Sequence, residues 1–188
     1  MVKALFLFVW VICGFAALNF RQIRQLRKLA GHYRGSLATY SFFMPAARGI
    51  CDGLPFSVHA GPRFMEVPGT LKIQLSLRPL IAMRVFRRSL PAKAASKMRL
   101  LTEVSTGDPL FDAEFAVFAR DVQTARSYLR QSSVIQGLLE LFKNGFWMVV
   151  VDGSSAWAEK LAYDRKLDLE LSRVSAVLRR LRLIATGA

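Results

Sequence analysis

The sequence predicts an α+β fold: an N-terminal transmembrane helix followed by a mainly antiparallel sheet with two or three packing helices. Three observations carry this prediction. Residues 4–18 are uniformly apolar, residues 32–88 alternate between apolar and polar side chains among turn signals, and residues 101–188 mix short apolar strands with helical periodicity. A chain of 188 residues has room for one domain and an anchor.

The N-terminal stretch MVKALFLFVWVICGFAALNF has the composition of a membrane anchor. No charged side chain lies between Lys3 and Arg21. As a helix, residues 4–20 would be roughly 25 Å long, and snorkelling arginines would extend this toward the bilayer core of about 30 Å. Gly14-Phe15-Ala16 offers a cleavage site for a signal peptide, but the basic segment that follows opposes translocation. We therefore expect a retained anchor.

Basic residues directly after this stretch predict its orientation and its surroundings. Because positive charge stays on the cytoplasmic side, we expect a single-pass protein of the bacterial inner membrane with its main domain cytoplasmic. Residues 1–30 would be the anchor with a basic juxtamembrane helix, and residues 31–188 the α+β domain. Contact with anionic membrane lipid, or alternatively a solvated stalk, is expected for the helix. The residues predicted to touch the membrane surface are Arg21, Arg24, Arg27, Lys28 and Arg34.

The first half of the domain is predicted to be extended. Strands are expected at 32–43, at 49–59 with an interruption at Gly53 and Pro55, and at 81–88. The clearest strand is LKIQLSL at 71–77, where leucine and isoleucine alternate with polar residues, so one face is buried and the other is wet. Residues 89–97 are small and lysine-bearing and mark a possible waist within one compact unit.

The second half is predicted to alternate strands and helices. A strand is expected at 115–119, a helix at 122–130 capped by Asp121, and a second helix from Ser132 or Ser133 to Phe142. The apolar run 146–151 and the turn at Asp152-Gly153 predict a hairpin. A last helix at 165–184 carries an apolar seam that would pack on the sheet or pair two copies of the chain. The seam consists of Leu167, Leu171, Val174, Leu178 and Leu181.

Charge is distributed unevenly along the chain. The net charge is +14, and residues 1–100 hold 16 of the 27 lysines and arginines but two of the 13 acidic residues. A one-sided basic field attracts anionic lipid or nucleic acid. No RNP-like or helix-turn-helix pattern accompanies the basic residues between 84 and 99, so nucleic acid is the less favoured partner.

The stretch TGDPLFDAEFAVFARD, 106–121, contains the best candidates for chemistry. If residues 110–119 were extended, Asp112 and Glu114 would share one face about 7 Å apart, which would suit a hydrolase. Both also lie where an alternating strand places solvated charges, so we favour a structural role. His32 and His59 have no partner at metal-ligand spacing, Cys13 and Cys51 form no framework, and no nucleotide or nucleophile-elbow motif is present; neither a metal nor a cofactor is predicted.

The segment from residue 106 to the hairpin near residue 153 resembles a block of bacterial membrane-anchored proteins described as DUF3137-like. The resemblance is a turn and strand of the type G-D-x-x-F-[DN]-x-x-F-x-V, followed by a helix of the type D-x-x-x-A-x-x-L. It implies a local fold and no particular activity, and therefore no catalytic residue. The matching positions are Gly107, Asp108, Phe111, Asp112, Phe115, Val117, Asp121, Ala125 and Leu129.

Taken together, the sequence predicts a membrane-tethered interaction or scaffold module without catalytic activity, with a protein partner on its sheet or its last helix. Two alternatives stay open. One is a membrane-associated hydrolase that uses Asp112 and Glu114. The other is a lipid-binding domain with a pocket between the sheet and the C-terminal helix.

Overall fold

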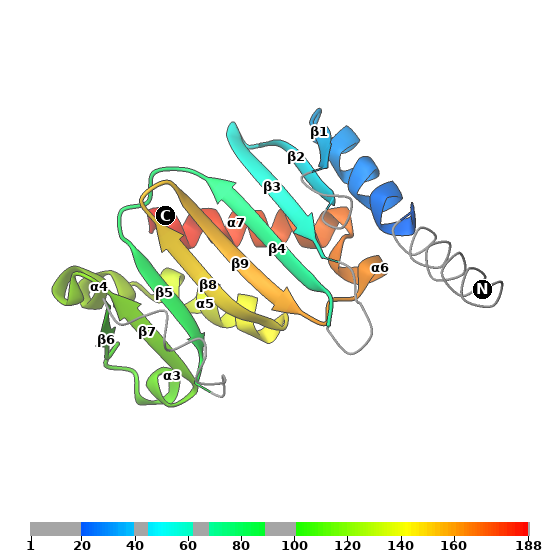
Figure 1. The fold of residues 1–188 in the computed structure, drawn as a ribbon. Coiled ribbons are helices and arrows are strands. Elements are labelled where there is room, and N and C mark those ends of the chain that lie inside the picture. Colours follow the sequence, from blue (N-terminus) through cyan, green and yellow to red (C-terminus); the bar gives the residue numbers. More distant parts are fainter. Residues whose placement is uncertain (1–19, 40–44, 62–67, 89–100, 188) are drawn as a thin grey trace, which may run out of the picture.

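The computed structural model describes residues 20–39, 45–61, 68–88 and 101–187. These residues form one sheet in the order β1-β2-β3-β4-β9-β8-β5-β7-β6, and each neighbouring pair is antiparallel (Figure 1). The strands are β1 (Ser36–Thr39), β2 (Pro45–Cys51), β3 (Leu54–Ala60), β4 (Thr70–Ser76), β5 (Met83–Arg87), β6 (Thr102–Val104), β7 (Phe115–Ala119), β8 (Phe146–Asp152) and β9 (Ser155–Leu161).

Helices cover one face of this sheet. The long helix α7 packs on β4 and β9, and α5 packs on β8 and on α7, so both lie behind the strands in Figure 1. A further helix over residues 20–32 precedes β1. The helices that follow are α3 (Pro109–Glu114), α4 (Val122–Leu129), α5 (Ser132–Lys143), α6 (Arg165–Asp168) and α7 (Leu171–Thr186).

The main core is a row of apolar side chains that runs across eight strands beneath these helices. Strand register places each member directly opposite the next. The helices cover the row with Leu138 and Leu141 from α5 and Val174, Leu178 and Leu181 from α7, all buried. In strand order the row is Ala47, Val58, Ile73, Ala158, Val149, Val85, Val117 and Val104, each at most 2% exposed.

Local sequence signals account for several of these elements. The alternation at 71–77 forms β4, and its buried and half-buried positions follow a period of two. The hairpin between β8 and β9 turns at Asp152, whose carboxylate accepts hydrogen bonds from the backbone N–H groups of Ser154 (3.2 Å) and Ser155 (3.0 Å). Helix α5 ends at Asn144-Gly145, where Gly145 adopts φ +86°.

The predicted transmembrane anchor is corrected by the structure. Among residues 20–39, 45–61, 68–88 and 101–187, no helix is long and apolar enough to cross a membrane. The apolar stretch on which the prediction depended, residues 1–19, lies outside the described residues, as does the predicted waist at 89–97. The single-pass inner-membrane assignment, and the cytoplasmic placement of the domain derived from it, therefore lose their support.

The helix over residues 20–32 also differs from a juxtamembrane helix. Its apolar face is buried within the protein, with Leu26, Leu29 and Ala30 each at most 3% exposed. Gln22 on the same face is fully buried, and its Nε2 donates to the carbonyl oxygen of Ala60 in β3. Because the protein core occupies this face, it is not available to lie in lipid headgroups.

Residues 110–114 are helical, whereas the sequence predicted one extended segment over 110–119. Asp108 accepts hydrogen bonds from the backbone N–H groups of Leu110 (2.9 Å) and Phe111 (3.1 Å), and Pro109 occupies the first helical position. This N-cap with a following proline starts α3, and the strand begins at Phe115. Asp112 and Glu114 are therefore not alternate residues of one strand.

The predicted C-terminal helix consists of two pieces. Asp164 caps the short helix α6, and Glu170 precedes the start of α7. In the predicted apolar seam, Val174, Leu178 and Leu181 are buried against the sheet, while Leu167 lies in α6 and is 51% exposed. Val174, Leu178 and Leu181 therefore belong to the core, so the seam as a whole is not a free surface that could pair two copies.

Replacing Leu181 with alanine is expected to destabilise the chain strongly. The side chain is fully buried between α7 and the sheet, so its loss removes transfer energy and leaves a cavity. We expect the free energy of unfolding to fall by about 2–5 kcal/mol. Denaturant unfolding measures this, and Leu80→Ala at a 69% exposed position is the control, for which the expected change is below about 0.5 kcal/mol. Equal losses for both variants would contradict this packing.

Candidate functional site

The face of the sheet opposite α5 and α7 carries a polar groove over β2, β3, β4 and β9. Its side chains alternate along the strands with those of the core row, so they point away from the face that α5 and α7 cover. Figure 1 shows these two helices on that opposite face. One cross-strand row contains His59, Lys72 and Glu159, and the adjacent row contains Arg48, Ser57 and Gln74. The charged residues of the groove thus come from four adjacent strands.

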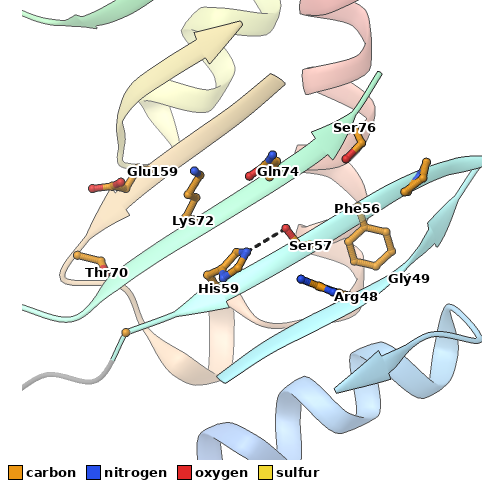
Figure 2. Close-up of a pocket in the computed structure, with 12 residues that line it drawn as sticks. Arg48, Gly49, Phe56, Ser57, His59, Thr70, Lys72, Gln74, Ser76 and Glu159 are labelled. Atoms are coloured by element: carbon orange, nitrogen blue, oxygen red, sulfur yellow. Dashed lines mark hydrogen bonds between the residues drawn. The ribbon is translucent and has the colours of Figure 1, made fainter. Parts of the chain in front are cut away.

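The groove has a volume of about 650 Å³. Figure 2 shows Arg48, His59, Lys72 and Glu159 above the strands, with the helices on the far side. Ser57 and His59 form a hydrogen bond of 3.0 Å between Oγ and Nε2. Lys72 places its Nζ 4.1 Å from the centre of the Trp157 ring. The residues that line the groove are Arg48, Gly49, Pro55, Phe56, Ser57, His59, Gly61, Thr70, Lys72, Gln74, Ser76 and Glu159.

Partial burial disfavours the charged form of the three central ionisable groups. Burial is the largest cause that lowers the pKa of His59, and the charges of Lys72 and Arg48 lower it further. Burial also lowers the pKa of Lys72, against the attraction of Glu159 and Asp152. Burial raises the pKa of Glu159, against Lys72 and the Trp147 indole. A bound anion would stabilise the positive charges here.

The Ser57–His59 pair does not form a nucleophile-and-base site. A hydrolytic serine needs nearby backbone N–H donors for a developing oxyanion. Ser57 lies inside β3, a strand paired on both sides with β2 and β4, so the backbone around it belongs to the ladder. The cationic neighbours of His59 also oppose proton uptake. The arrangement is suited to binding an anion and not to general-base catalysis.

The residues of the sequence motif at 107–121 come together as a local structural unit. Gly107 adopts φ +88° at the turn, and Asp108 caps α3. Phe111 and Phe115 are buried, and the Phe115 ring stacks on Phe142 at 4.4 Å. Val117 belongs to the core row, and Asp121 caps α4 by accepting from the backbone N–H of Thr124 (3.0 Å).

Asp112 is saturated by structural hydrogen bonds. Its carboxylate accepts from Ser105 Oγ (2.7 Å), Thr106 N (3.0 Å), Thr106 Oγ1 (2.8 Å) and Gly107 N (3.3 Å). Burial acts to raise its pKa, but hydrogen bonds from Ser105, Thr106 and Gly107 outweigh burial and lower it. Glu114 is exposed at the end of α3. This geometry ties the chain before α3 to the helix and offers no pair of carboxylates to a substrate.

The basic residues predicted to touch a membrane are not among the described residues that line the groove. Arg21, Arg24, Arg27 and Lys28 are exposed on the helix over residues 20–32, and Arg34 is exposed in the following turn with φ +49°. Their contact with a membrane surface stays a prediction. In the cluster beginning at residue 84, Arg87 donates to the carbonyl of Phe142 (2.8 Å) and Arg88 to that of Asp112 (2.6 Å), so both are used within the fold.

Sequence reasoning missed the groove. The alternation of β4 indicated that Lys72 and Gln74 face away from the core. His59 was considered only as a metal ligand without a partner, and Arg48 and Glu159 were not singled out. The missing information is the register of β2, β3, β4 and β9, which joins residues up to 111 positions apart along the chain (Arg48 and Glu159). Within the described parts of the chain, no group of three or more metal-ligating side chains lies together.

Comparison with known proteins assigns no family. No protein-family model matches the chain, and no curated protein matches it, so the DUF3137-like resemblance stays a prediction. Among solved structures, the crystal structure of the mycobacterial trehalose monomycolate transport factor A, TtfA, is similar in chain path. It shares 10% sequence identity with a TM-score of 0.48, over 87% of this chain and 96% of that one. This level of similarity assigns neither a family nor a ligand.

Replacing Asp112 with asparagine is expected to destabilise the chain. The amide keeps the shape but turns one acceptor into a donor that faces Ser105, Thr106 and Gly107. The expected loss in free energy of unfolding is about 1–3 kcal/mol at pH 7. Because the folded pKa of Asp112 lies below its usual value of 3.8, the difference between wild type and variant should shrink as the pH falls through that range. Glu114→Gln is the exposed control, and an equally large loss there would contradict this role.

Proposed function

We propose that the protein is a non-catalytic binding module that holds an anionic group of its ligand in the groove on the outer face of the sheet. One observation carries the proposal: three cationic or protonatable side chains from three adjacent strands, Arg48, His59 and Lys72, line one groove. His59 and Lys72 are half-buried there, and Arg48 is exposed. Among the described residues that line the groove, Glu159 is the one acidic side chain, so Arg48 and Lys72 leave these residues with a net positive charge.

Hydrogen-bonding groups around these charges support the same conclusion. Ser57, Thr70 and Gln74 supply hydroxyl and amide donors between the cationic side chains. Charge-assisted hydrogen bonds of this kind are stronger than neutral ones, which suits a phosphate or carboxylate group. An interaction module also agrees with the absence of catalytic geometry at Ser57 and His59.

Removing the Lys72 charge should weaken anion binding. In Lys72→Met, the methionine keeps most of the side-chain volume over Trp157 but cannot pair with an anion. We expect the affinity for glycerol 3-phosphate to fall about tenfold, as expected for one charge-assisted hydrogen bond. Titration followed by NMR chemical shifts measures this change.

The matched control for this variant is Lys143→Met at an exposed position in the last turn of α5. It removes the same charge from the chain, so it separates a groove effect from a change in overall charge. Equal affinities for Lys72→Met and the wild type, or no binding of glycerol 3-phosphate by the wild type, would contradict the proposed function.

Sulfate should bind more tightly as the pH falls from 7.5 to 5.5. The pKa of His59 in the folded chain lies below its ordinary value of 6.5, so protons bind more readily to the unfolded chain. The contribution of neutral His59 to the stability of the folded chain therefore falls as the pH drops through 6.5. Sulfate in the groove stabilises the protonated ring and should recover that loss. Sulfate keeps its charge over this range, so the change reports on the protein.

Thermal unfolding with and without sulfate checks this pH dependence. His59→Gln should make the stabilisation by sulfate nearly independent of pH. Glu159→Gln tests a second possible cause of the pH dependence. The pKa of Glu159 is raised, so its carboxylate also loses negative charge in the groove as the pH falls. A pH dependence that survives in His59→Gln and is lost in Glu159→Gln would assign the effect to the carboxyl group.

A further inference from the structure

A second cavity with cationic side chains lies where β5 begins and where β7 and β8 end. Its described lining includes Arg84 in β5, Arg120 directly after β7 and Asp152 at the end of β8. The cavity has a volume of about 320 Å³. None of the described residues that line it also lines the groove, so the two spaces are separate. We call this space the second cavity.

Strand register places Arg84 on the same face of the sheet as the groove. Arg84 lies opposite Val150, which lies opposite Trp157. Trp157 in turn lies opposite Gln74, which lines the groove, and the row continues over β3 to Arg48 on β2. Side chains directly opposite one another in antiparallel strands point to the same side of the sheet. One row therefore carries an arginine within the groove and a second arginine beyond Trp157.

Arg84 occupies an unusual position for a cationic side chain. It belongs to β5, which is paired on both sides, and its neighbours across the strands are the apolar residues Val150 and Phe118. The side chain is half-buried, and within the described parts of the chain it forms no hydrogen bond or ion pair. Partial burial of a charged group without a partner costs free energy. An anion bound at Arg84 would offset this cost.

The other charged residues of the second cavity also favour an anion. Arg120 is exposed and likewise has no hydrogen bond or ion pair with a described residue. Asp152 is the one acid among the described lining residues, and its Oδ1 already accepts from the backbone N–H groups of Ser154 and Ser155 in the hairpin turn. Two arginines and one carboxylate leave these residues with a net positive charge. Guanidinium groups bind phosphate and carboxylate through paired, charge-assisted hydrogen bonds.

Strand spacing sets the distance between the groove and the second cavity. Lys72 on β4 and Arg84 on β5 are separated by β9 and β8, which gives roughly 14 Å at about 4.8 Å per strand (Figure 1). Between the two strands, the row of Arg84 presents the half-buried Trp157 and then Val150, which is 4% exposed. Glu159 belongs to the neighbouring row. A ligand that follows the row of Arg84 therefore meets no carboxylate between the groove and the second cavity.

We propose that the ligand is elongated and carries two anionic groups, each a phosphate or a carboxylate. One group lies in the groove with Arg48, His59 and Lys72, and the other lies in the second cavity with Arg84 and Arg120. This inference rests on the proposed function, because it assigns the first group to the groove. A ligand with a single anionic group would occupy one cavity and leave the arginines of the other without a partner.

Three probes, titrated separately into the full chain and followed by calorimetry, test this proposal. Tetraethylene glycol bisphosphate carries two phosphates on a linker long enough to span both cavities. Ethylene glycol bisphosphate carries them too close together, and tetraethylene glycol monophosphate keeps the long linker with one phosphate. We expect the long bisphosphate to bind at least about tenfold more tightly than either of the others, because a tethered second group binds at a high effective concentration only when the linker spans both sites.

Arg84→Met tests the second cavity without changing the groove. The methionine keeps an apolar side chain at this position but cannot bind a phosphate. The long bisphosphate should then bind about as weakly as the monophosphate, and the affinity for the monophosphate should stay unchanged. Arg130→Met is the matched control, because it removes the same charge from an exposed residue at the end of α4 that lines neither cavity.

The outcomes separate the inference from the proposed function. Binding of the monophosphate without a gain from the long bisphosphate, or with an equal gain from the short one, would overturn the two-group ligand and leave the anion site in the groove standing. A gain that survives in Arg84→Met, or that Arg130→Met removes equally, would assign the effect to overall charge and also overturn the inference. Absence of binding for all three probes would overturn the inference and the proposed function together.

Discussion

The structure depends on burying one face of a single antiparallel sheet. The eight-strand row from Ala47 to Val104 is buried, with α7 packed on β4 and β9, α5 on β8 and α4 on β6, and this row defines which face of each strand is internal. A slip of one residue in any of these strands would exchange its buried and exposed side chains. The register that buries Val58, Ile73 and Ala158 is therefore the same register that brings His59, Lys72 and Glu159 together on the other face.

The helical layer can cover this row because α5 and α7 approach each other closely. Gly137 lies on the contact face of α5, where an added Cβ would come within 3.2 Å of side-chain atoms of Leu183 and Ile184. Tyr128 in α4 donates from its hydroxyl to the carbonyl of Ile184 (2.9 Å), which ties the preceding helix to the end of α7. With the layer fixed on one side, the described helices α5 and α7 leave the groove face open.

The sequence predicted elements well where the deciding forces are local. The alternation in β4, the Asp152 turn and the Asp121 cap each act within a few residues, and each lies where it was predicted. The prediction was wrong where two local signals competed, as at 110–114, where the Asp108 cap and Pro109 prevailed over apolar alternation. The basic helix at 20–32 was misplaced for another reason: its apolar spacing suits a lipid surface and a protein core equally, and tertiary packing decided between them.

The groove could not be predicted because it is a property of strand register across four strands. No local rule connects Arg48 with Glu159, and His59 alone is an ordinary residue of a broken strand. The aligned strands bury Lys72 and His59 partly, and this burial disfavours the charged form of each side chain. Such placement reduces stability and contributes nothing to the apolar core on the opposite face. The half-buried His59 and Lys72 on this face are accounted for most simply by an anionic group of a ligand that stabilises their charged forms.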